Sequence, residues 1–255
     1  MVDRFLFSGL RQDGRRPKEL RLIECEMGVE PGADGSAVWH QGNTVVYATV
    51  QGPKESTFRS RNQTGRAQIS VEFFLAPFSG SDRRVRSRFD RRNKEIAQAL
   101  QQTLQTAIVG EQFPRSQISI NINVVQADGG VRSAAMNAAT LALVDAGIPM
   151  HDFVACCSAG FLQDTAVLDP NSSEEGAAGG GPGGSASPDL PVALFPASGE
   201  ISLLQLGSQL PCEKLADLMQ LASEGCQQIA ALMRECVTKH VASRLRSRET
   251  VTRTD

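Results

Sequence analysis

The centre of the chain, residues 118–146, reads ISININVVQADGGVRSAAMNAATLALVDA. Its first eight residues alternate apolar and polar side chains, which is the pattern of a half-buried β-strand. An alanine-rich helix is expected from Ser133 to Ala146, closed by Gly147 with Pro149 after it. Between strand and helix stands the run Gln126-Ala127-Asp128-Gly129-Gly130. A glycine turn that opens a helix presents backbone N–H groups to an anion, so this stretch predicts an anion site within an α/β fold.

Basic charge is concentrated upstream of that stretch. The chain carries 26 Lys and Arg against 28 Asp and Glu, a formal net charge of −2, so its overall charge predicts no partner. Six arginines nevertheless lie within ten residues, at Arg83, Arg84, Arg86, Arg88, Arg91 and Arg92. The arginines and the glycine turn together indicate that a polyanionic substrate and free phosphate are handled close to each other.

Length and composition limit the class of protein. With 255 residues, of which 41% are hydrophobic, the chain is long enough for one large globular domain or two small ones. No stretch approaches the roughly 20 apolar residues of a membrane span. The start, Met1 to Phe5, lacks a secretory hydrophobic region. We therefore expect no membrane association.

The cysteines and histidines predict no metal site. None of the six cysteines forms a CxxC pair, so we expect reduced thiols packed in the core of an intracellular protein. The three histidines are isolated and lack ligand spacing, which argues against structural zinc. In order along the chain, the cysteines are Cys25, Cys156, Cys157, Cys212, Cys226 and Cys236, and the histidines are His40, His151 and His240.

Periodicity predicts an α+β, or mixed α/β, arrangement. The order of strands followed by a helix recurs weakly in each half of the chain. Strands are expected at 21–27, 36–39, 44–50, 68–74, 118–125, 154–161, 165–168, 191–195 and 200–206. Apolar residues at Ile96, Leu100, Leu104 and Ile108 predict a helix, and its buried stripe extends backwards to Arg92 and Arg88. A long amphipathic helix is expected from Cys212 to Val241, and a frayed charged tail from Arg244 to Asp255. Residues 176–188 are rich in Gly, Ser and Pro and predict a mobile loop.

Several short motifs occur together in one known order, and through them the chain resembles the RNase PH family. The resemblance covers roughly residues 8–242. It implies one RNase PH-like domain over 1–255, with a core at about 8–242. It also implies two similar βαβ-type halves whose helices pack on mixed sheets, a fold related to ribosomal protein S5 domain 2. The motifs are Asp13-Gly14-Arg15-Arg16, Met27-Gly28-Val29, Asp34-Gly35-Ser36-Ala37, Gln41-Gly42-Asn43-Thr44, Pro114-Arg115-Ser116-Gln117-Ile118, residues 141–150 (LALVDAGIPM) and Cys157-Ser158-Ala159-Gly160-Phe161.

Within the family, the chain is most similar to the ring subunits of the eukaryotic exosome. That resemblance implies a six-membered ring of RNase PH-like subunits, with RNA-binding cap subunits and hydrolytic nucleases as further partners. It also implies a place in the nucleus, nucleolus and cytoplasm. Active family members perform phosphorolysis: inorganic phosphate, assisted by Mg²⁺, attacks the last phosphodiester of an RNA 3′ end and releases a nucleoside diphosphate.

The resemblance also implies site residues. Gly130, Val131, Arg132 and Ser133 match the family's phosphate loop, and Arg92 matches a helix arginine that faces the same pocket. Two aspartates that would hold Mg²⁺ and act in catalysis are matched by Glu175 and Asp189. Glu175 is one methylene longer than the expected aspartate, and the 176–188 insert separates the pair in sequence.

Those two departures predict weak phosphorolysis or none. A ring subunit with little activity of its own is therefore the first hypothesis. An active phosphate-dependent 3′→5′ exoribonuclease is the second, and a phosphate-binding enzyme acting on small molecules is the third.

RNA contact is expected along a basic track that does not read sequence. Its arginines belong to the polar loop at 58–66 and to the cluster at 83–92, and they are Arg59, Arg61, Arg66, Arg88 and Arg91.

Overall fold

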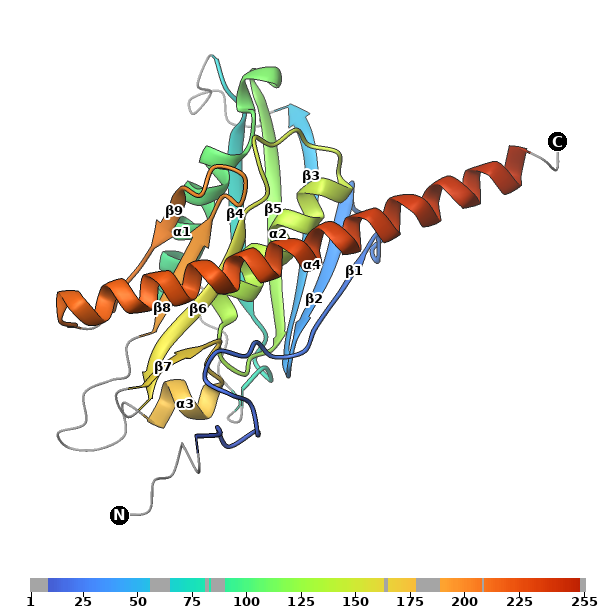
Figure 1. The fold of residues 1–255 in the computed structure, drawn as a ribbon. Coiled ribbons are helices and arrows are strands. Elements are labelled where there is room, and N and C mark those ends of the chain that lie inside the picture. Colours follow the sequence, from blue (N-terminus) through green and yellow to red (C-terminus); the bar gives the residue numbers. More distant parts are fainter. Residues whose placement is uncertain are drawn as a thin grey trace.

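The computed structural model describes residues 9–55, 65–80, 83, 90–162, 165–177, 189–207 and 209–252. Its strands and helices follow the order seen in Figure 1. The strands are β1 (Ile23–Met27), β2 (Gly35–Gln41), β3 (Thr44–Glu55), β4 (Gln68–Leu75), β5 (Ser116–Gln126), β6 (Ala155–Leu162), β7 (Thr165–Leu168), β8 (Leu190–Leu194) and β9 (Ile201–Leu204). The helices are α1 (Arg91–Ala107), the short 3-10 helix η2 (Gly110–Gln112), α2 (Val131–Asp145), α3 (Ser172–Ala177) and α4 (Cys212–Thr252).

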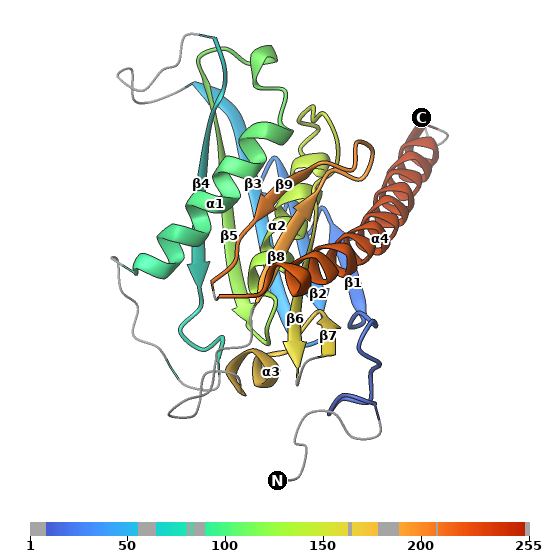
Figure 2. The ribbon, with the colours of Figure 1, turned by 60° about the vertical axis from the view of Figure 1, so that its left-hand side comes forward.

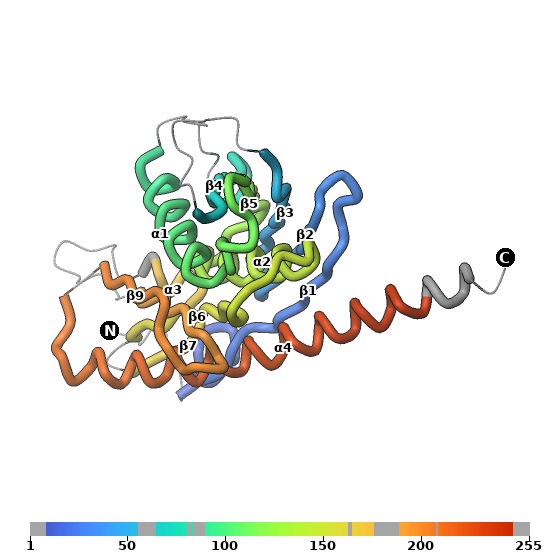
Figure 3. The backbone as a smooth tube through the Cα atoms, turned by 90° about the horizontal axis from the view of Figure 1, so that it is seen from above, coloured from blue at the N-terminus to red at the C-terminus, as the bar shows by residue number. Residues whose placement is uncertain are grey.

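Two sheets alternate with two layers of helices. The first sheet has the order β1-β2-β3-β5-β4, and all of its pairs are antiparallel except the parallel pair β4–β5. The second sheet, β7-β6-β8-β9, is antiparallel throughout. Viewed from above, α1 and α2 lie between the sheets, and α4 covers the outer face of the second sheet (Figure 3). The mixed α/β prediction is confirmed.

Helix α2 is the centre of the fold. Every residue from Ser133 to Leu143 is buried, because α2 contacts β2 and β3 on one side and β6 and β8 on the other. Alanines let both sheets approach closely, and a helix that is apolar all round is one buried on all sides. Strands β6 and β8 are likewise covered on both faces, which explains their continuous apolar runs.

Helix α4 departs from the prediction. It continues as helix to Thr252, so the expected frayed tail from Arg244 is wrong up to that residue. Figure 2 shows α4 running across the second sheet and past β1. Nitrogens of Arg244 and His240 lie 3.0 Å and 3.2 Å from Oδ1 of Asp145, at the end of α2. These contacts tie α4 to the end of α2 at His240 and Arg244, and the helix then projects beyond the body (Figure 1). No helix within the described residues is long and apolar enough to cross a membrane.

Two further predictions need correction. Helix α3 was not expected, and it takes in residues 176–177 of the segment predicted as a mobile loop; residues 178–188 lie outside the described part of the chain. The prediction that all six cysteines pack in the core is wrong for Cys212, which is exposed. Cys25 and Cys236 are only half-buried. A period of apolar residues places a cysteine on a helix, but it does not determine whether another element covers that face.

Candidate functional site

The turn between β5 and α2 requires glycine at two consecutive positions. Gly129 and Gly130 have φ angles of 75° and 61°, in the left-handed region that other residues avoid. A Cβ atom on Gly129 would lie 2.5 Å from the carbonyl oxygen of Pro170, so space forbids a side chain there as well. The turn thus brings bare backbone close to the segment that follows β7.

A buried arginine holds this turn in place. Arg21 donates from Nε to Oδ2 of Asp169 at 2.9 Å and from Nη2 to Oδ1 at 2.6 Å. The same guanidinium donates to the carbonyl oxygens of Asp128 and Gly129, the latter at 3.1 Å. Thr44 Oγ1 also donates to Gly129 O, at 2.9 Å. Both carboxylate oxygens of Asp169 therefore accept hydrogen bonds from Arg21, as a buried ion pair requires.

A second buried ion pair fixes α3 beside the turn. Arg11 bridges to Glu174, with Nε 2.9 Å from Oε1, and both side chains are fully buried. Arg11 also donates to the carbonyl oxygens of Leu168, at 2.6 Å, and Asp169, at 2.9 Å. Anchoring Glu174 directs the next residue, Glu175, towards the glycine turn.

Glu175 reaches the N-terminus of α2. Its Oε1 accepts a hydrogen bond of 2.7 Å from the backbone N–H of Gly130, the residue that caps this helix. Burial raises the pKa of Glu175 to about 7, with the negative charge of Asp189 as the second cause. The Gly130 N–H and the positive charges of Arg21 and Arg92 act in the opposite direction. A carboxyl group that titrates near neutral pH therefore occupies the mouth of the predicted phosphate loop.

Asp189 lies close to Glu175, at the start of β8. Burial raises its pKa, while the charges of Arg132 and Arg92 and the hydroxyl of Ser158 lower it. Its Oδ1 atom is buried and has no hydrogen-bond partner among the described residues. The 176–188 insert thus separates the two carboxylates in sequence but not in space.

The two predicted phosphate-binding arginines approach this pair from different elements. Arg132 is the second residue of α2, and its Nη1 donates to Oε1 of Gln205 at 2.8 Å. Gln205 in turn donates to Glu95 on α1, also at 2.8 Å. Arg92 is an exposed residue in the first turn of α1. Both arginines act on Asp189 through their charge, and none of the ion pairs among the described residues joins them to either carboxylate. Within the described residues, neither guanidinium group is therefore neutralised by direct contact with Glu175 or Asp189.

The other residues of the predicted phosphate loop present backbone groups. Ser133 is fully buried, and its hydroxyl lies 2.7 Å from that of Ser158, so its side chain is engaged inside the fold. Gly130, Val131, Arg132 and Ser133 open α2, and the first N–H groups of a helix lack intrahelical acceptors. Their alignment favours a negative charge at this end. The arrangement can bind a phosphate beside two carboxylates.

The carboxylate pair also suits the predicted Mg²⁺. Magnesium is commonly bound through one or two carboxylates together with substrate phosphates and water. Glu175 and Asp189 supply that oxygen set, and the Oδ1 atom of Asp189, which lacks a hydrogen-bond partner among the described residues, would be free to coordinate the ion. Within the described residues, no group of three or more His, Cys, Asp or Glu side chains is placed to hold a metal ion by itself. Magnesium here would depend on the phosphate.

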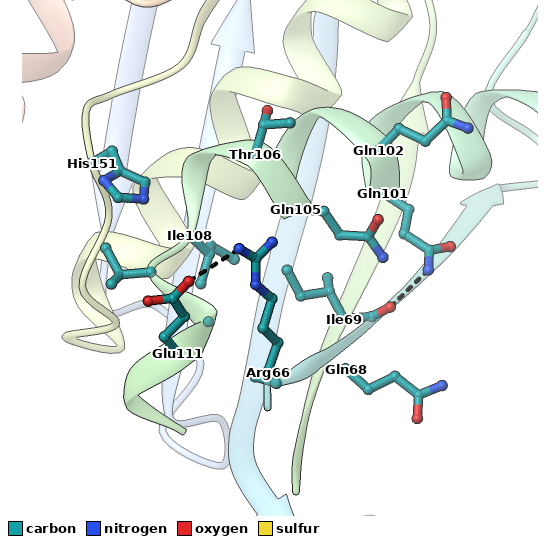
Figure 4. Close-up of a pocket in the computed structure, with 13 residues that line it drawn as sticks. Arg66, Gln68, Ile69, Gln101, Gln102, Gln105, Thr106, Ile108, Glu111 and His151 are labelled. Atoms are coloured by element: carbon teal, nitrogen blue, oxygen red, sulfur yellow. Dashed lines mark hydrogen bonds and ion pairs between the residues drawn. The ribbon is translucent and has the colours of Figure 1, made fainter. Parts of the chain in front are cut away.

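The predicted RNA-binding arginines do not gather at one point. Arg66 precedes β4 and forms an ion pair of 3.0 Å with Glu111, both exposed, beside a cavity of about 810 Å³ (Figure 4). Glutamines of α1 line the same cavity, and Gln101 donates to the carbonyl oxygen of Ile69. Arg91 begins α1 at its other end, roughly 25 Å away for 17 residues of helix. Arg59, Arg61 and Arg88 lie outside the described residues.

Several residues that shape the site were not predicted. Arg11, Arg21 and Thr44 hold the glycine turn and α3 from the N-terminal part of the chain, and Ser158 and Gln205 contact the charged groups from the second sheet. Thr44 and Ser158 belong to motifs that mark the family, but those motifs do not reveal these contacts, and Arg11, Arg21 and Gln205 belong to none of them. A buried arginine resembles an exposed one in sequence, and only the fold shows which carboxylate it meets.

Comparison with known proteins defines the class. The model of the 3′ exoribonuclease family, domain 1, matches residues 19–149, and that of domain 2 matches residues 152–225. The chain therefore belongs to the 3′ exoribonuclease, or RNase PH, family, and the resemblance seen in the sequence is confirmed. That the whole chain forms one domain stays a prediction.

Particular relatives are similar over most of their length. The chain is 46% identical over 233 residues to the exosome complex component RRP41 homolog of Arabidopsis thaliana, covering 91% of this chain and 93% of that protein. It is 44% identical over 234 residues to exosome complex component RRP41 of Homo sapiens, with 91% and 92% covered. Among solved structures it resembles rice (Oryza sativa) Rrp46, with a TM-score of 0.76 and 28% identity, covering 89% of this chain and 100% of that chain.

Proposed function

We propose that this protein is a subunit of an exosome-type ring that binds RNA without reading its sequence and takes part in 3′→5′ RNA processing and degradation. The observation that carries the proposal is the meeting of Arg92, Arg132 and the glycine turn beside Glu175 and Asp189. This is a phosphate site next to groups able to act on an RNA end. The relatives named as exosome components support the assembly.

Intrinsic catalysis is proposed to be weak or absent. The carboxylate of Glu175 already accepts the Gly130 N–H, so an incoming phosphate competes with an internal anion at the mouth of its loop. The side chain of Glu175 is also one methylene longer than the aspartate that the family resemblance implies. A small displacement of a catalytic group is enough to lower a rate on the order of a hundredfold.

An active phosphorolytic exoribonuclease is the second candidate, and a specific observation favours it. The negative charge of Asp189 acts on Glu175, and both carboxylates experience the charge of Arg92. In phosphorolysis an oxygen of orthophosphate attacks the terminal phosphorus, the P–O3′ bond breaks, and the leaving 3′ oxygen takes up a proton. With a pKa of about 7, Glu175 retains a proton to donate at neutral pH. Bound Mg²⁺ would supply charge neutralisation at the same phosphodiester.

The experiment incubates the reconstituted ring with 5′-labelled RNA, Mg²⁺ and inorganic phosphate. The first proposal expects the RNA to remain intact and to be retained in a gel-shift assay. Phosphate-dependent release of nucleoside diphosphates, lost in Arg132→Ala and Asp189→Ala, would instead establish the active enzyme. Activity that survives both substitutions would reveal a contaminating nuclease.

The remaining partners are proposed on the same basis. RNA-binding cap subunits and hydrolytic nucleases would assemble on the ring, in the nucleus, nucleolus and cytoplasm. The third hypothesis, a phosphate-binding enzyme that acts on small molecules, is the alternative to RNA binding. Salt-sensitive retention of RNA distinguishes the two, since counterion release makes RNA binding weaken steeply with salt.

A further inference from the structure

Two half-buried cysteines from distant parts of the chain meet at the edge of the first sheet. Cys25 lies on β1, the edge strand, and Cys236 lies on α4, 211 residues further on. The Sγ atom of Cys236 is 3.3 Å from the carbonyl oxygen of Cys25, to which it donates a hydrogen bond. The two thiols also lie within hydrogen-bonding reach of each other. Packing of α4 on β1 thus places the sulfur atoms of two half-buried cysteines beside each other.

The surroundings favour ionisation of Cys236. A hydrogen bond from the Cys25 thiol lowers the pKa of Cys236, burial opposes this, and the charge of Lys239 lowers the pKa further. Glu26 acts in the opposite sense. Lys239 is exposed one turn along α4 and pairs with Glu235 at 2.7 Å. Because the thiolate is the reactive form, Cys236, which lies one helical turn from the cationic Lys239 on α4, is assigned as the nucleophile and Cys25 as the resolving thiol.

A second thiol pair provides an internal contrast. Cys157 and Cys226 also lie near each other, but both are fully buried, and burial raises the pKa of each well above its usual value. The Sγ atom of Cys226 donates to the carbonyl oxygen of Val192 at 3.3 Å. This pair is closed to oxidants and stays protonated. Two cysteines that lie close together are therefore not reactive unless an oxidant can reach them and one of them can ionise.

We infer that Cys25 and Cys236 form a reversible disulfide that links β1 to α4 when the protein meets a hydroperoxide. The Cys236 thiolate attacks the O–O bond of the peroxide: an S–O bond forms, the O–O bond breaks, and the departing hydroxide takes a proton to become water. The sulfur of Cys25 then attacks the sulfenic acid: the S–S bond forms, the S–O bond breaks, and a second water leaves with the Cys25 proton. The two sulfur atoms lose two electrons, and the peroxide gains them.

The test uses the full chain carrying Cys212→Ser, which removes the exposed thiol and so prevents links between chains. After treatment with hydrogen peroxide and alkylation, peptide mass spectrometry should find Cys25 joined to Cys236. Cys157 and Cys226 should be alkylated only after denaturation. Linkage of any other pair, or free alkylation of both Cys25 and Cys236, would overturn the inference.

Two variants make the order of events testable. In Cys25→Ser the reaction should stop at a sulfenic acid on Cys236, which dimedone traps, whereas Cys236→Ser should leave Cys25 unmodified. Trapping on Cys25 instead would contradict the assignment of the nucleophile. A bond closed across some 200 residues should raise the unfolding midpoint by roughly 5–10 °C, reversibly on reduction. No rise on linkage would show that the bond distorts the native contact of α4 with β1.

Discussion

At the scale of single residues, the site combines buried charges that are satisfied with others that are not. Arg21 and Asp169 are 8% and 0% exposed and satisfy each other fully. Glu175 and Asp189 are held close together with only partial compensation, so burial raises the pKa of each. Carboxyl groups displaced from their usual pKa in this way are typical of sites where a charged ligand binds.

Glu175 should make stability depend on pH. Its folded pKa of about 7 lies above its ordinary value of 4.5, so the folded state holds the proton more tightly. The stabilisation is complete below about pH 4.5 and is lost as pH rises through 7. Urea unfolding at pH 5 and pH 8 should show Glu175→Gln recovering about 1–3 kcal/mol relative to wild type at the higher pH. Equal pH dependence in both proteins would contradict a raised pKa.

At the scale of elements, the glycine turn works only because β5, α2 and the segment after β7 are fixed together. The turn follows a strand that alternates buried and exposed residues and opens a helix buried on all sides. Neither neighbour can shift to make room. The turn is therefore rigid, as an anion site built from backbone N–H groups requires.

Gly129→Ala should destabilise the protein by about 2–4 kcal/mol, since a Cβ meets Pro170 O at 2.5 Å and φ is 75°. Gly147→Ala is the matched control. It has a similar φ of 69°, but nothing lies within 4 Å, so only the backbone strain of about 1 kcal/mol remains. Denaturant unfolding measures both variants. Equal losses would show that conformation alone, and not the close approach, requires glycine at position 129.

Much of this element structure follows from local pattern. The strand at 118–125, the hairpin around Gly42 and the glycine turn are each determined by residues adjacent in sequence. The contacts that complete the site are not. Arg21 meets Asp169 across 148 residues, and Glu175 meets Gly130 across 45. Periodicity places a residue on a face but carries no information on which distant face it meets.

At the scale of the whole molecule, two of the predicted RNA-binding arginines lie near opposite ends of α1. Arg91 is the first residue of α1, and Arg66 lies near the other end of the helix, beside η2. The two cannot bind the same phosphate group, so an RNA strand touching both must run along the helix. The sequence predicts the arginines but not their separation, which depends on how α1 packs on β4.

Arg66→Ala and Arg91→Ala should each weaken RNA binding to a similar extent for any sequence. Each substitution should lower the slope of log affinity against log salt by roughly 0.7–1, because one phosphate contact is lost. Fluorescence anisotropy with the assembled ring at several salt concentrations measures the slope. In the double variant the slope should fall by the sum of the two single decreases. A change that depends on RNA sequence, or an unaltered slope, would contradict a track that reads only the backbone.

The central claim is that Arg92, Arg132 and the glycine turn bind orthophosphate together. Equilibrium dialysis of labelled phosphate against the full-length protein tests it directly. We predict saturable binding that weakens about tenfold or more in both Arg92→Ala and Arg132→Ala, since each removes a charge-assisted hydrogen bond. Arg234→Ala, on the exposed face of α4, should bind as wild type does. Absence of saturable binding, or an equal effect of all three substitutions, would contradict the account.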